Sequence, residues 1–355
     1  MRAFNVSMLT FCALPVLAGC AQSAVQQEPI LLEKLVFYDW AADSIEEIFD
    51  DFTQEYGIEI DYVTFDSTEE AVANIRDGQN YDIVIIENQH VLSLVAEGLL
   101  AEIDPANVPN TKNISPSFRD LSYDPGNRFS IPYSWGTTGL VVRTDLTEDP
   151  VTSWSDMWDP RYAGQVANWL TTPRFTIGAA LLSLGYSVNS EDASELEEAL
   201  QWLLQIKDDT IWLDDEPTAA PLLVNGDAVM ALGWSEDFWL AQEGSDDIEY
   251  VLPSEGTILW GDNYVIPANS ENKYAAELFL DFVLRPEISA ELVNSGYYPL
   301  PNDAAIPLID PEILADPAVY PTNEQMRNAQ FLLPLSAAGE QLHADVWTRF
   351  MASNP

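Results

Sequence analysis

Residues 35–86 read LVFYDWAADSIEEIFDDFTQEYGIEIDYVTFDSTEEAVANIRDGQNYDIVII, and three segments in them have the length and composition of strands. These segments are 35–38, 58–63 and 81–86, and the residues between them have the spacing of short helices. The expected order is therefore strand, helix, strand, helix, strand. Apolar residues that follow one another without alternation predict a sheet covered on both faces, as parallel sheets are.

Polar and aromatic residues follow two of these expected strands. Asp39 and Trp40 end the first strand, and Glu87, Asn88 and Gln89 follow the third. Ligands of parallel sheets bind beyond the carboxyl ends of the strands. These residues are therefore candidates for a binding site.

Two later segments have the composition of extended strands that cross between lobes. They are residues 131–142, with small residues at the centre, and residues 258–267. A chain of 355 residues exceeds the size at which single cores stop growing, which is about 250 to 300 residues. We expect an α/β protein of two lobes joined by these crossover segments, with a ligand cleft between the lobes. The expected boundaries are 34–136 plus 260–304 for lobe 1 and 137–259 plus 305–355 for lobe 2.

The N-terminus has the pattern of an export signal. Arg2 precedes an apolar run that is too short to span a bilayer stably, and the run ends in Leu17-Ala18-Gly19-Cys20. That tetrad resembles the bacterial lipobox, which implies a signal peptide over 1–19, a lipid on Cys20 and a tether over 20–33. The alternative is an ordinary signal peptide with an incidental cysteine. With Cys12 removed and Cys20 acylated, no thiol is left for a disulfide.

The charge of the chain excludes one class of partner and suggests a habitat. Asp and Glu total 58 against 14 Lys and Arg, for a formal net charge of −44. Nucleic-acid binders neutralise phosphates with clustered Lys and Arg, and the sequence contains no such cluster. Self-repulsion on this scale destabilises a compact chain unless salt screens it. We therefore predict a halophilic acidic surface that meets external salt.

Motifs for catalysis and metal binding are missing from the sequence. It contains no Gly-x-Ser-x-Gly elbow, no Gly-rich phosphate loop with Lys and no EF-hand spacing. His90 and His343 are its two histidines, so a metal site or triad built on histidine is not expected. We predict a protein that is not an enzyme and uses no cofactor or metal. A secreted glycosidase with paired carboxylates stays open as an alternative.

Tryptophan and aspartate recur together at the ends of expected elements. The pairs are Asp39 with Trp40, Trp234 with Asp237, and Trp260 with Asp262. An indole face attracts an alkylammonium group, at about 0.5 to 2 kcal/mol, and a carboxylate accepts a charge-assisted hydrogen bond from it. The alternative for each pair is a core Trp and a helix-capping Asp. Three such pairs favour a receptor for an ammonium compound.

In these residues the chain resembles the spermidine/putrescine-binding proteins, the extracytoplasmic receptors of polyamine ABC importers. The resemblance extends through nearly all of the chain after the signal. The matching motifs are Phe37-Tyr38-Asp39-Trp40, Ser130-Ile131-Pro132-Tyr133-Ser134-Trp135-Gly136, Ser153-Trp154-Ser155-Asp156-Met157-Trp158 with Gly164, Gly233-Trp234-Ser235-Glu236-Asp237, Trp260-Gly261-Asp262 with Ile266-Pro267-Ala268-Asn269, and Tyr298-Pro299-Leu300-Pro301-Asn302.

The resemblance implies a type II periplasmic-binding fold and a role for each matching residue. Trp40 and Trp234 would flank the methylene chain of a polyamine, and Trp260 would add an apolar wall. Asp237 and Asp262 would bind its ammonium groups, with Tyr298 near the hinge. It also implies a periplasmic, membrane-anchored monomer that delivers putrescine or spermidine to an ABC permease.

The chain departs from the family pattern at positions that are expected to contact the ligand. Relatives place acidic residues at the start of the first helix of lobe 2, but this chain has Thr172 and Phe175. Glu87 or Asp43 would supply the lost charge from the opposite lobe. The alternative is the same fold with another solute, such as an amino acid, betaine or a sugar.

Overall fold

Three parallel strands form the first part of the sheet. Strand β1 (Lys34–Trp40) lies between β2 (Glu59–Phe65) and β3 (Ile83–Glu87) and is parallel to both. Helix α1 (Phe49–Tyr56) connects β1 to β2, and α2 (Thr68–Arg76) connects β2 to β3. The predicted order of strands and helices in residues 35–86 is confirmed.

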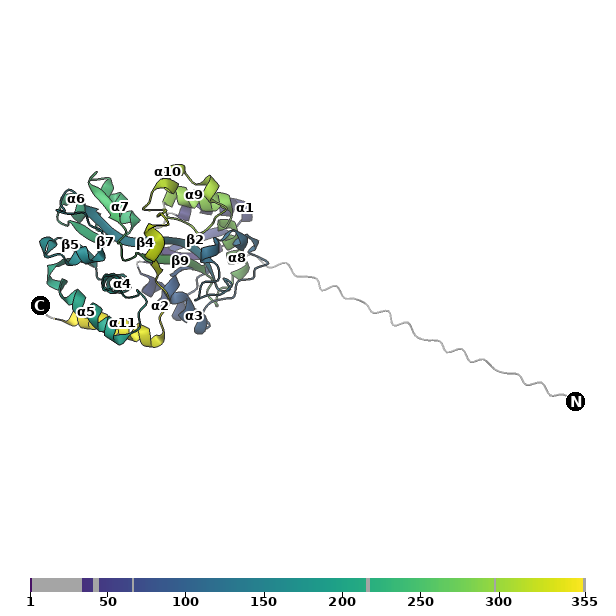
Figure 1. The fold of residues 1–355 in the computed structure, drawn as a ribbon. Helices are drawn as coiled ribbons and strands as arrows, with labels where there is room; N and C mark the ends of the chain where they lie inside the picture. The colour runs from purple at the N-terminus through teal and green to yellow at the C-terminus, as the bar shows by residue number, and fades with distance from the viewer. Residues whose placement is uncertain (2–33, 41–44, 66, 215–217, 297, 354–355) are drawn as a thin grey trace. The chain divides into compact units, whose positions relative to one another are not determined.

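The computed structural model describes residues 1, 34–40, 45–65, 67–214, 218–296 and 298–353 (Figure 1). Residues 31–355 form one unit, and residues 1–30 form another. The further helices are α3 (Asn88–Ala96), α4 (Pro173–Ser183), α5 (Ala193–Leu204), α6 (Ala220–Asn225), α7 (Ser235–Gln242), α8 (Lys273–Val283), α9 (Pro286–Gly296), α10 (Pro311–Ala315) and α11 (Ala337–Ala352). The further strands are β4 (Ser130–Arg143), β5 (Val166–Trp169), β6 (Thr210–Leu213), β7 (Met230–Gly233), β8 (Ile248–Val251), β9 (Ile258–Val265) and β10 (Gln330–Phe331).

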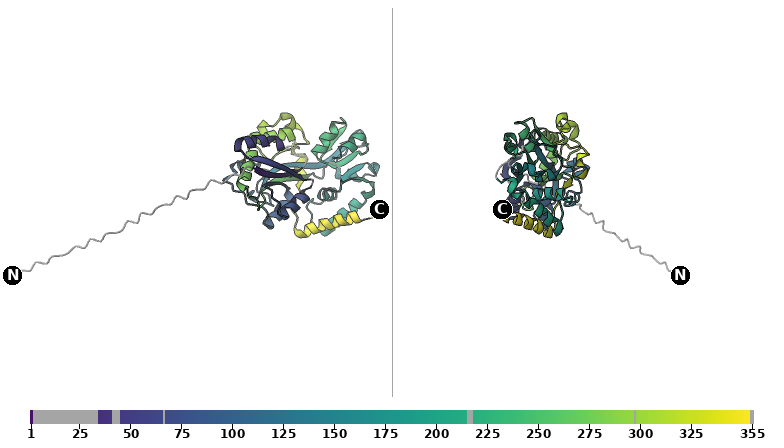
Figure 2. Two further views of the ribbon diagram at one scale, coloured as in Figure 1. Left: turned by 180° about the vertical axis from the view of Figure 1, so that it is seen from behind. Right: turned by 60° about the vertical axis from the view of Figure 1, so that its left-hand side comes forward.

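Helices cover both faces of the sheet (Figure 2). Successive residues of β3 are buried in different clusters, because side chains alternate across a strand. Ile85 packs in the cluster that contains Phe52 of α1 and Phe279 of α8. Ile86 packs in the cluster that contains Leu94 of α3. Burial on both sides explains why β3 is apolar without alternation.

Two long antiparallel strands join the first sheet region to a second one. β9 pairs with β3 and with the first part of β4, from Ser130 opposite Val265 to Thr138 opposite Ile258. From Gly139 onward β4 pairs with β7 and β8. β4 and β9 are the predicted crossing strands, and they connect the first half-sheet (β2-β1-β3-β9) to the second half-sheet (β7-β5-β6). The lobe boundaries given above stay a prediction.

The second half-sheet also consists of parallel strands. β5 pairs in parallel with β6 and with β7, and α4 and α5 pack with α11 in one apolar cluster. The sequence pattern also predicts helices over 176–184, 195–206, 274–284, 286–294 and 341–350 and a strand over 228–234. Helices α4, α5, α8, α9 and α11 and strand β7 confirm these expectations, whereas β5, β6 and β8 were not expected. These three strands and β7 have four residues each, but β7 lies within the continuous apolar run 228–234, whereas the other three lie in no such run.

The export signal and the lipidation site lie outside the described residues. This holds for the predicted signal region from residue 2, for Cys20 and for the tether to residue 33. In the part of the chain that the structure describes, no helix has the length and apolar composition needed to cross a bilayer.

Candidate ligand-binding site

A cavity of about 100 Å³ lies where the carboxyl ends of β1 and β3 face the start of α4. Its first wall comes from the first half-sheet and the start of α2 and α3, and its second wall from the turn before α4 and the first residues of that helix. The first wall consists of Trp40, Ser67, Thr68, Glu69, Glu87 and Gln89, and the second wall of Thr171, Thr172, Pro173, Arg174 and Phe175. Its position beyond parallel strand ends is the usual one for a ligand in an α/β sheet.

Trp40 contributes an aromatic surface to the first wall. It is the last residue of β1, its side chain is partly buried, and its ring packs on Phe65 with centroids 4.8 Å apart. The backbone N–H of Trp40 donates to the carboxylate of Asp39 at 2.8 Å. The indole is therefore held in place at the end of the strand.

Glu87 contributes the negative charge of the first wall. It is the last residue of β3, and Gln89 Nε2 donates to its Oε2 at 2.9 Å. Burial raises the pKa of Glu87 to about 7, the charge of Glu69 adds to this rise, and the contacts of Gln89 and Thr68 oppose it. The carboxylate is therefore costly to ionise without a cation nearby.

His90 lies beside Glu87 but does not neutralise it. The His90 Nε2 and Glu87 Oε2 atoms are 4.0 Å apart. Burial lowers the pKa of His90 to about 4, and the charge of Arg174 adds to this effect. The imidazole is therefore neutral near pH 7.

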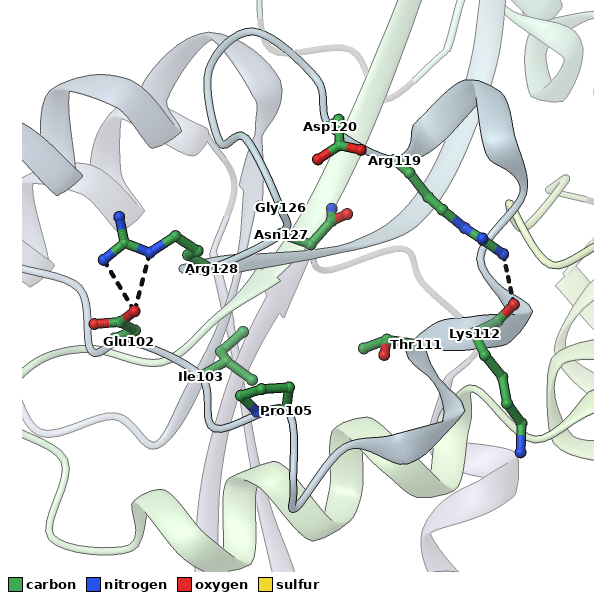
Figure 3. Close-up of a pocket in the computed structure, with 10 residues that line it drawn as sticks. All are labelled: Glu102, Ile103, Pro105, Thr111, Lys112, Arg119, Asp120, Gly126, Asn127 and Arg128. Carbon is green, nitrogen blue, oxygen red and sulfur yellow. Dashed lines mark hydrogen bonds and ion pairs between the residues drawn. The ribbon is translucent and has the colours of Figure 1, made fainter.

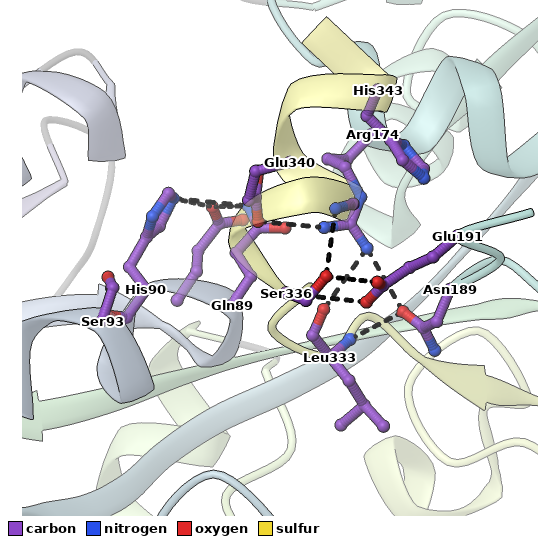
Figure 4. A network of polar contacts seen from close by, with 12 residues as sticks. Gln89, His90, Ser93, Arg174, Asn189, Glu191, Leu333, Ser336, Glu340 and His343 are labelled. Atoms are coloured by element: carbon purple, nitrogen blue, oxygen red, sulfur yellow. Dashed lines mark hydrogen bonds and ion pairs between the residues drawn. The ribbon is translucent and has the colours of Figure 1, made fainter. Parts of the chain in front are cut away.

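Arg174 contributes the positive charge of the second wall. Its side chain is buried near the start of α4, and its Nη2 donates to Asn189 Oδ1 at 3.2 Å and to the carbonyl oxygen of Leu333 at 3.3 Å. Nη1 is 3.9 Å from a carboxylate oxygen of Glu340 (Figure 4). Burial lowers the pKa of Arg174, and the charges of Glu340, Glu87 and Glu191 oppose this shift.

Phe175 connects the cavity to the predicted tryptophan at the end of β7. Phe175 is buried, and its ring meets Trp234 edge-on with centroids 5.6 Å apart. Trp234 also packs on Trp169, again with centroids 5.6 Å apart. Trp234 is thus one ring contact behind the cavity wall.

Asp237 is buried, and its carboxylate closes the first turn of α7. Its Oδ1 accepts from the Thr218 hydroxyl at 2.6 Å and from the Ala219 N–H at 2.9 Å, and its Oδ2 accepts from the Trp234 N–H at 3.1 Å. Burial raises the pKa of Asp237, and these three hydrogen bonds oppose the rise. Both oxygens therefore already stabilise the local structure.

Asp262 and Trp260 lie on β9. Asp262 is buried and stands directly opposite Glu87 in the antiparallel pair of β9 and β3. The Trp260 ring is 5.9 Å from Tyr298 between centroids, and the Tyr298 hydroxyl donates to Glu236 at 2.7 Å. Gly136 on β4 makes room for this indole, since a Cβ there would be 2.3 Å from Trp260 Cζ2.

The structure brings four of the predicted residues together in the cavity lining, namely Trp40, Glu87, Thr172 and Phe175. Trp234 and Asp262 adjoin this group through Phe175 and Glu87, whereas Asp237, Trp260 and Tyr298 have the other contacts given above. Asp43 lies outside the described residues. The sequence interpretation missed the lining residues Ser67, Thr68, Glu69, Thr171, Pro173 and Arg174. Gln89 was among the candidates that follow the third expected strand, and it lines the cavity.

A larger cavity of about 620 Å³ is less suited to an amine (Figure 3). No aromatic side chain is among its lining residues in the described chain, and three of them, Lys112, Arg119 and Arg128, are basic. Arg128 pairs with Glu102 at 2.9 Å, and Arg119 donates to main-chain carbonyl oxygens.

Among the described residues no group of three or more His, Cys, Asp or Glu side chains could hold a metal ion.

Comparison with known proteins assigns the family. The profile of the bacterial extracellular solute-binding proteins matches residues 47–322. The spermidine/putrescine-binding periplasmic protein of Escherichia coli K12 is 33% identical over 309 residues, which cover 86% of this chain and 88% of that protein. The chain belongs to the spermidine/putrescine-binding family of solute-binding proteins. Members of this family are periplasmic or extracytoplasmic substrate-binding proteins of ABC transporters and not enzymes.

Two further relatives align with most of this chain. The putrescine-binding periplasmic protein SpuD of Pseudomonas aeruginosa UCBPP-PA14 is 29% identical, with 98% of each chain covered. The structure of the substrate-binding protein PotD of a spermidine/putrescine ABC transporter from Streptococcus pneumoniae superposes with a TM-score of 0.80 at 31% identity. That match covers 90% of this chain and 99% of the other. It confirms the predicted α/β fold of the type II periplasmic-binding class.

Proposed function

We propose that this protein is a polyamine receptor that binds putrescine or spermidine between its two lobes and delivers it to an ABC permease. The observation that carries the proposal is the cavity that combines the Trp40 indole with the Glu87 carboxylate. An indole face attracts alkylammonium groups and a carboxylate accepts their hydrogen bonds, so this pair suits a protonated amine.

In this proposal the other predicted residues complete the site. Trp234 flanks the methylene chain behind Phe175, and Trp260 and Tyr298 add an apolar wall when the lobes close. Asp262 and Asp237 anchor ammonium groups, with Asp262 acting beside Glu87. Ligand contacts from both walls favour the closed form, because a ligand shifts a conformational equilibrium only through differential contacts.

The proposal includes a lipid anchor on Cys20 after removal of residues 1–19. The lipobox-like tetrad supports it. Expression with a radiolabelled fatty acid should label the full-length chain, and Cys20→Ala should remove the label. A labelled Cys20→Ala variant would contradict the anchor and leave the ligand proposal unaffected.

A thermal-shift panel with calorimetry tests the proposed ligand class. Putrescine, spermidine, glycine betaine and a neutral sugar are compared in about 1 M NaCl, where long-range steering is screened. A ligand at 100 times its Kd stabilises the folded state by about 2.7 kcal/mol, which a melting curve detects readily. We expect stabilisation by a polyamine. Stabilisation by betaine or the sugar, with no response to polyamines, would overturn the proposal.

A further inference from the structure

The two walls of the cavity differ in charge and in hydrogen-bonding character. On the first wall the charged groups are the carboxylates of Glu69 and Glu87, and Asp262 on β9 stands directly opposite Glu87 in the strand register. On the second wall, residues 171–175 include no carboxylate, and their charged group is Arg174. The cavity is therefore dipolar across its two walls.

Some buried polar atoms of the lining residues lack hydrogen-bond partners, and they differ between the two walls in the same sense as the charges do. Among the described residues, Oε1 of Gln89 on the first wall has no hydrogen-bond partner, and this oxygen can only accept. On the second wall Nε of Arg174 and Oγ1 of Thr172 have no partner there either. The Nε–H can only donate, and a hydroxyl can donate. The Thr68 hydroxyl on the first wall also has no partner among the described residues, and a hydroxyl can donate or accept, so Thr68 and Thr172 do not distinguish the walls. The walls differ in the acceptor-only oxygen of Gln89 and the donor-only Nε–H of Arg174.

Arg174 is fixed in this orientation by contacts outside the cavity. The residue is 9% exposed, its Nη2 donates to Asn189 and Leu333, and its Nη1 lies 3.9 Å from a carboxylate oxygen of Glu340 (Figure 4). Asn189 lies in the segment that follows α4, whereas Leu333 and Glu340 lie far from α4 in sequence. The guanidinium therefore stays in the wall instead of turning to pair with Glu87.

A diamine can donate hydrogen bonds to the acceptors of the first wall, but it cannot accept one from Arg174 on the second wall. One ammonium group can donate to Glu87 and Gln89, but a second one has no lone pair to accept from Arg174 and is repelled by the guanidinium. A buried donor that is left without an acceptor weakens binding, because its hydration is lost without replacement.

We infer that, within the amine class proposed above, this cavity selects an amine with one ammonium end and one hydrogen-bond-accepting end. The ammonium group lies against Glu87 and Gln89, and the accepting group receives hydrogen bonds from Arg174 Nε and Thr172 Oγ1. The accepting end is the carbonyl of an acylated polyamine or a carboxylate. The inference rests on the proposed function, since it takes the cavity to be an amine site.

Calorimetry with ligands of matched chain length tests the inference. The probes are putrescine, N-acetylputrescine, whose far end is a neutral carbonyl, and 4-aminobutanoate, whose far end is a carboxylate. We expect at least one acceptor-ended probe to bind about tenfold more tightly than putrescine, the factor typical of one well-placed hydrogen bond. The tighter of the two identifies which acceptor the second wall prefers.

Thr172→Val tests the donor role with little change of shape. The Thr172 side chain makes no capping hydrogen bond to helix α4. Loss of its hydroxyl should therefore leave the melting temperature nearly unchanged. We expect the preference for the acceptor-ended probe over putrescine to fall several-fold. Thr152→Val is the matched control, because Thr152 is exposed and is not a lining residue of the cavity. This control should keep the wild-type preference.

The outcomes separate the inference from the proposed function. Putrescine that binds as tightly as both acceptor-ended probes, or an unchanged preference in Thr172→Val, would overturn the inference and leave the polyamine receptor intact. Failure of putrescine, spermidine and N-acetylputrescine alike to bind would overturn the proposed function.

Discussion

Glu87 and Asp262 lie directly opposite each other in the antiparallel pair of strands β3 and β9. Side chains in such a pair have Cβ atoms about 4.5 to 5.5 Å apart, and like charges in this position repel. Asp262 is buried and Glu87 lines the cavity, so water screens this repulsion weakly. A bound cation next to Glu87 would relieve the repulsion, which gives a physical reason for a basic ligand at this place.

The affinity for an amine should depend on pH through Glu87. Burial raises the pKa of Glu87 to about 7, with Glu69 adding to the rise. An ammonium group binds the ionised carboxylate, so the affinity for putrescine should be full above pH 8 and should fall as Glu87 takes up a proton between pH 8 and 6. Calorimetry at a series of pH values in buffers of equal ionic strength measures this dependence.

Glu87→Gln serves as the control for this pH dependence. The amide keeps the size of the side chain and cannot ionise. The variant should bind putrescine weakly and with nearly constant affinity between pH 6 and 8. A wild-type affinity that is constant over this range would show that Glu87 does not carry the ligand charge.

Asp262→Asn should reduce affinity more than it reduces stability. Removing one charge of a buried pair costs about 2 to 5 kcal/mol of binding free energy. The substitution also removes the repulsion between residue 262 and Glu87, which offsets part of the stability lost with the other contacts of Asp262. Putrescine or spermidine affinity equal to that of the wild type would contradict the anchoring role.

Asp237→Asn should reduce stability as well as affinity. The Asp237 carboxylate accepts from Thr218, Ala219 and Trp234, and two of these three donors are backbone N–H groups. An amide would direct its NH₂ group at one of them, which leaves a buried donor unsatisfied at a cost of about 1 to 3 kcal/mol of unfolding free energy. Urea unfolding checks this loss. An unchanged midpoint would show that these bonds contribute little to stability.

The fold could be predicted from the sequence where apolar patterns are long. β1 and β3 are recognisable because both faces are covered, so every position of Ile83–Ile86 is apolar and buried. β4 is recognisable from its length and from small residues such as Gly136, which makes room for Trp260. β5 and β6 are four residues long and, unlike β7 within the apolar run 228–234, lie in no long apolar run that distinguishes strand from loop.

The site could be predicted where it depends on strand ends and not where it depends on distant contacts. Trp40 and Glu87 were predicted because they end expected strands, and both line the cavity. Arg174 was missed because a base is not sought in a receptor for cations. Its orientation is set by Asn189, 15 residues further on, and by Leu333, 159 residues further on. The contacts of Asp237 with residues 218 and 219 likewise leave no local pattern.

Salt should stabilise this protein. The chain has 58 acidic and 14 basic residues, so ion pairs cannot neutralise its acids. Arg161, for example, pairs with Glu148, Asp149 and Asp159 at once. The remaining carboxylates repel one another in the folded chain, and the Debye length falls from about 10 Å at 0.1 M to about 3 Å at 1 M. We expect the melting temperature to rise as NaCl increases from about 0.1 to 2 M, most steeply at the low end.

A neutral solute distinguishes screening from preferential exclusion. Sucrose is excluded from protein surfaces and stabilises folded states without screening charges, so its effect should grow steadily with concentration. Screening by NaCl should instead level off once the Debye length is shorter than the spacing between carboxylates. A melting temperature that falls with NaCl, or that rises with the same profile as in sucrose, would show that repulsion between the acids is not what limits stability.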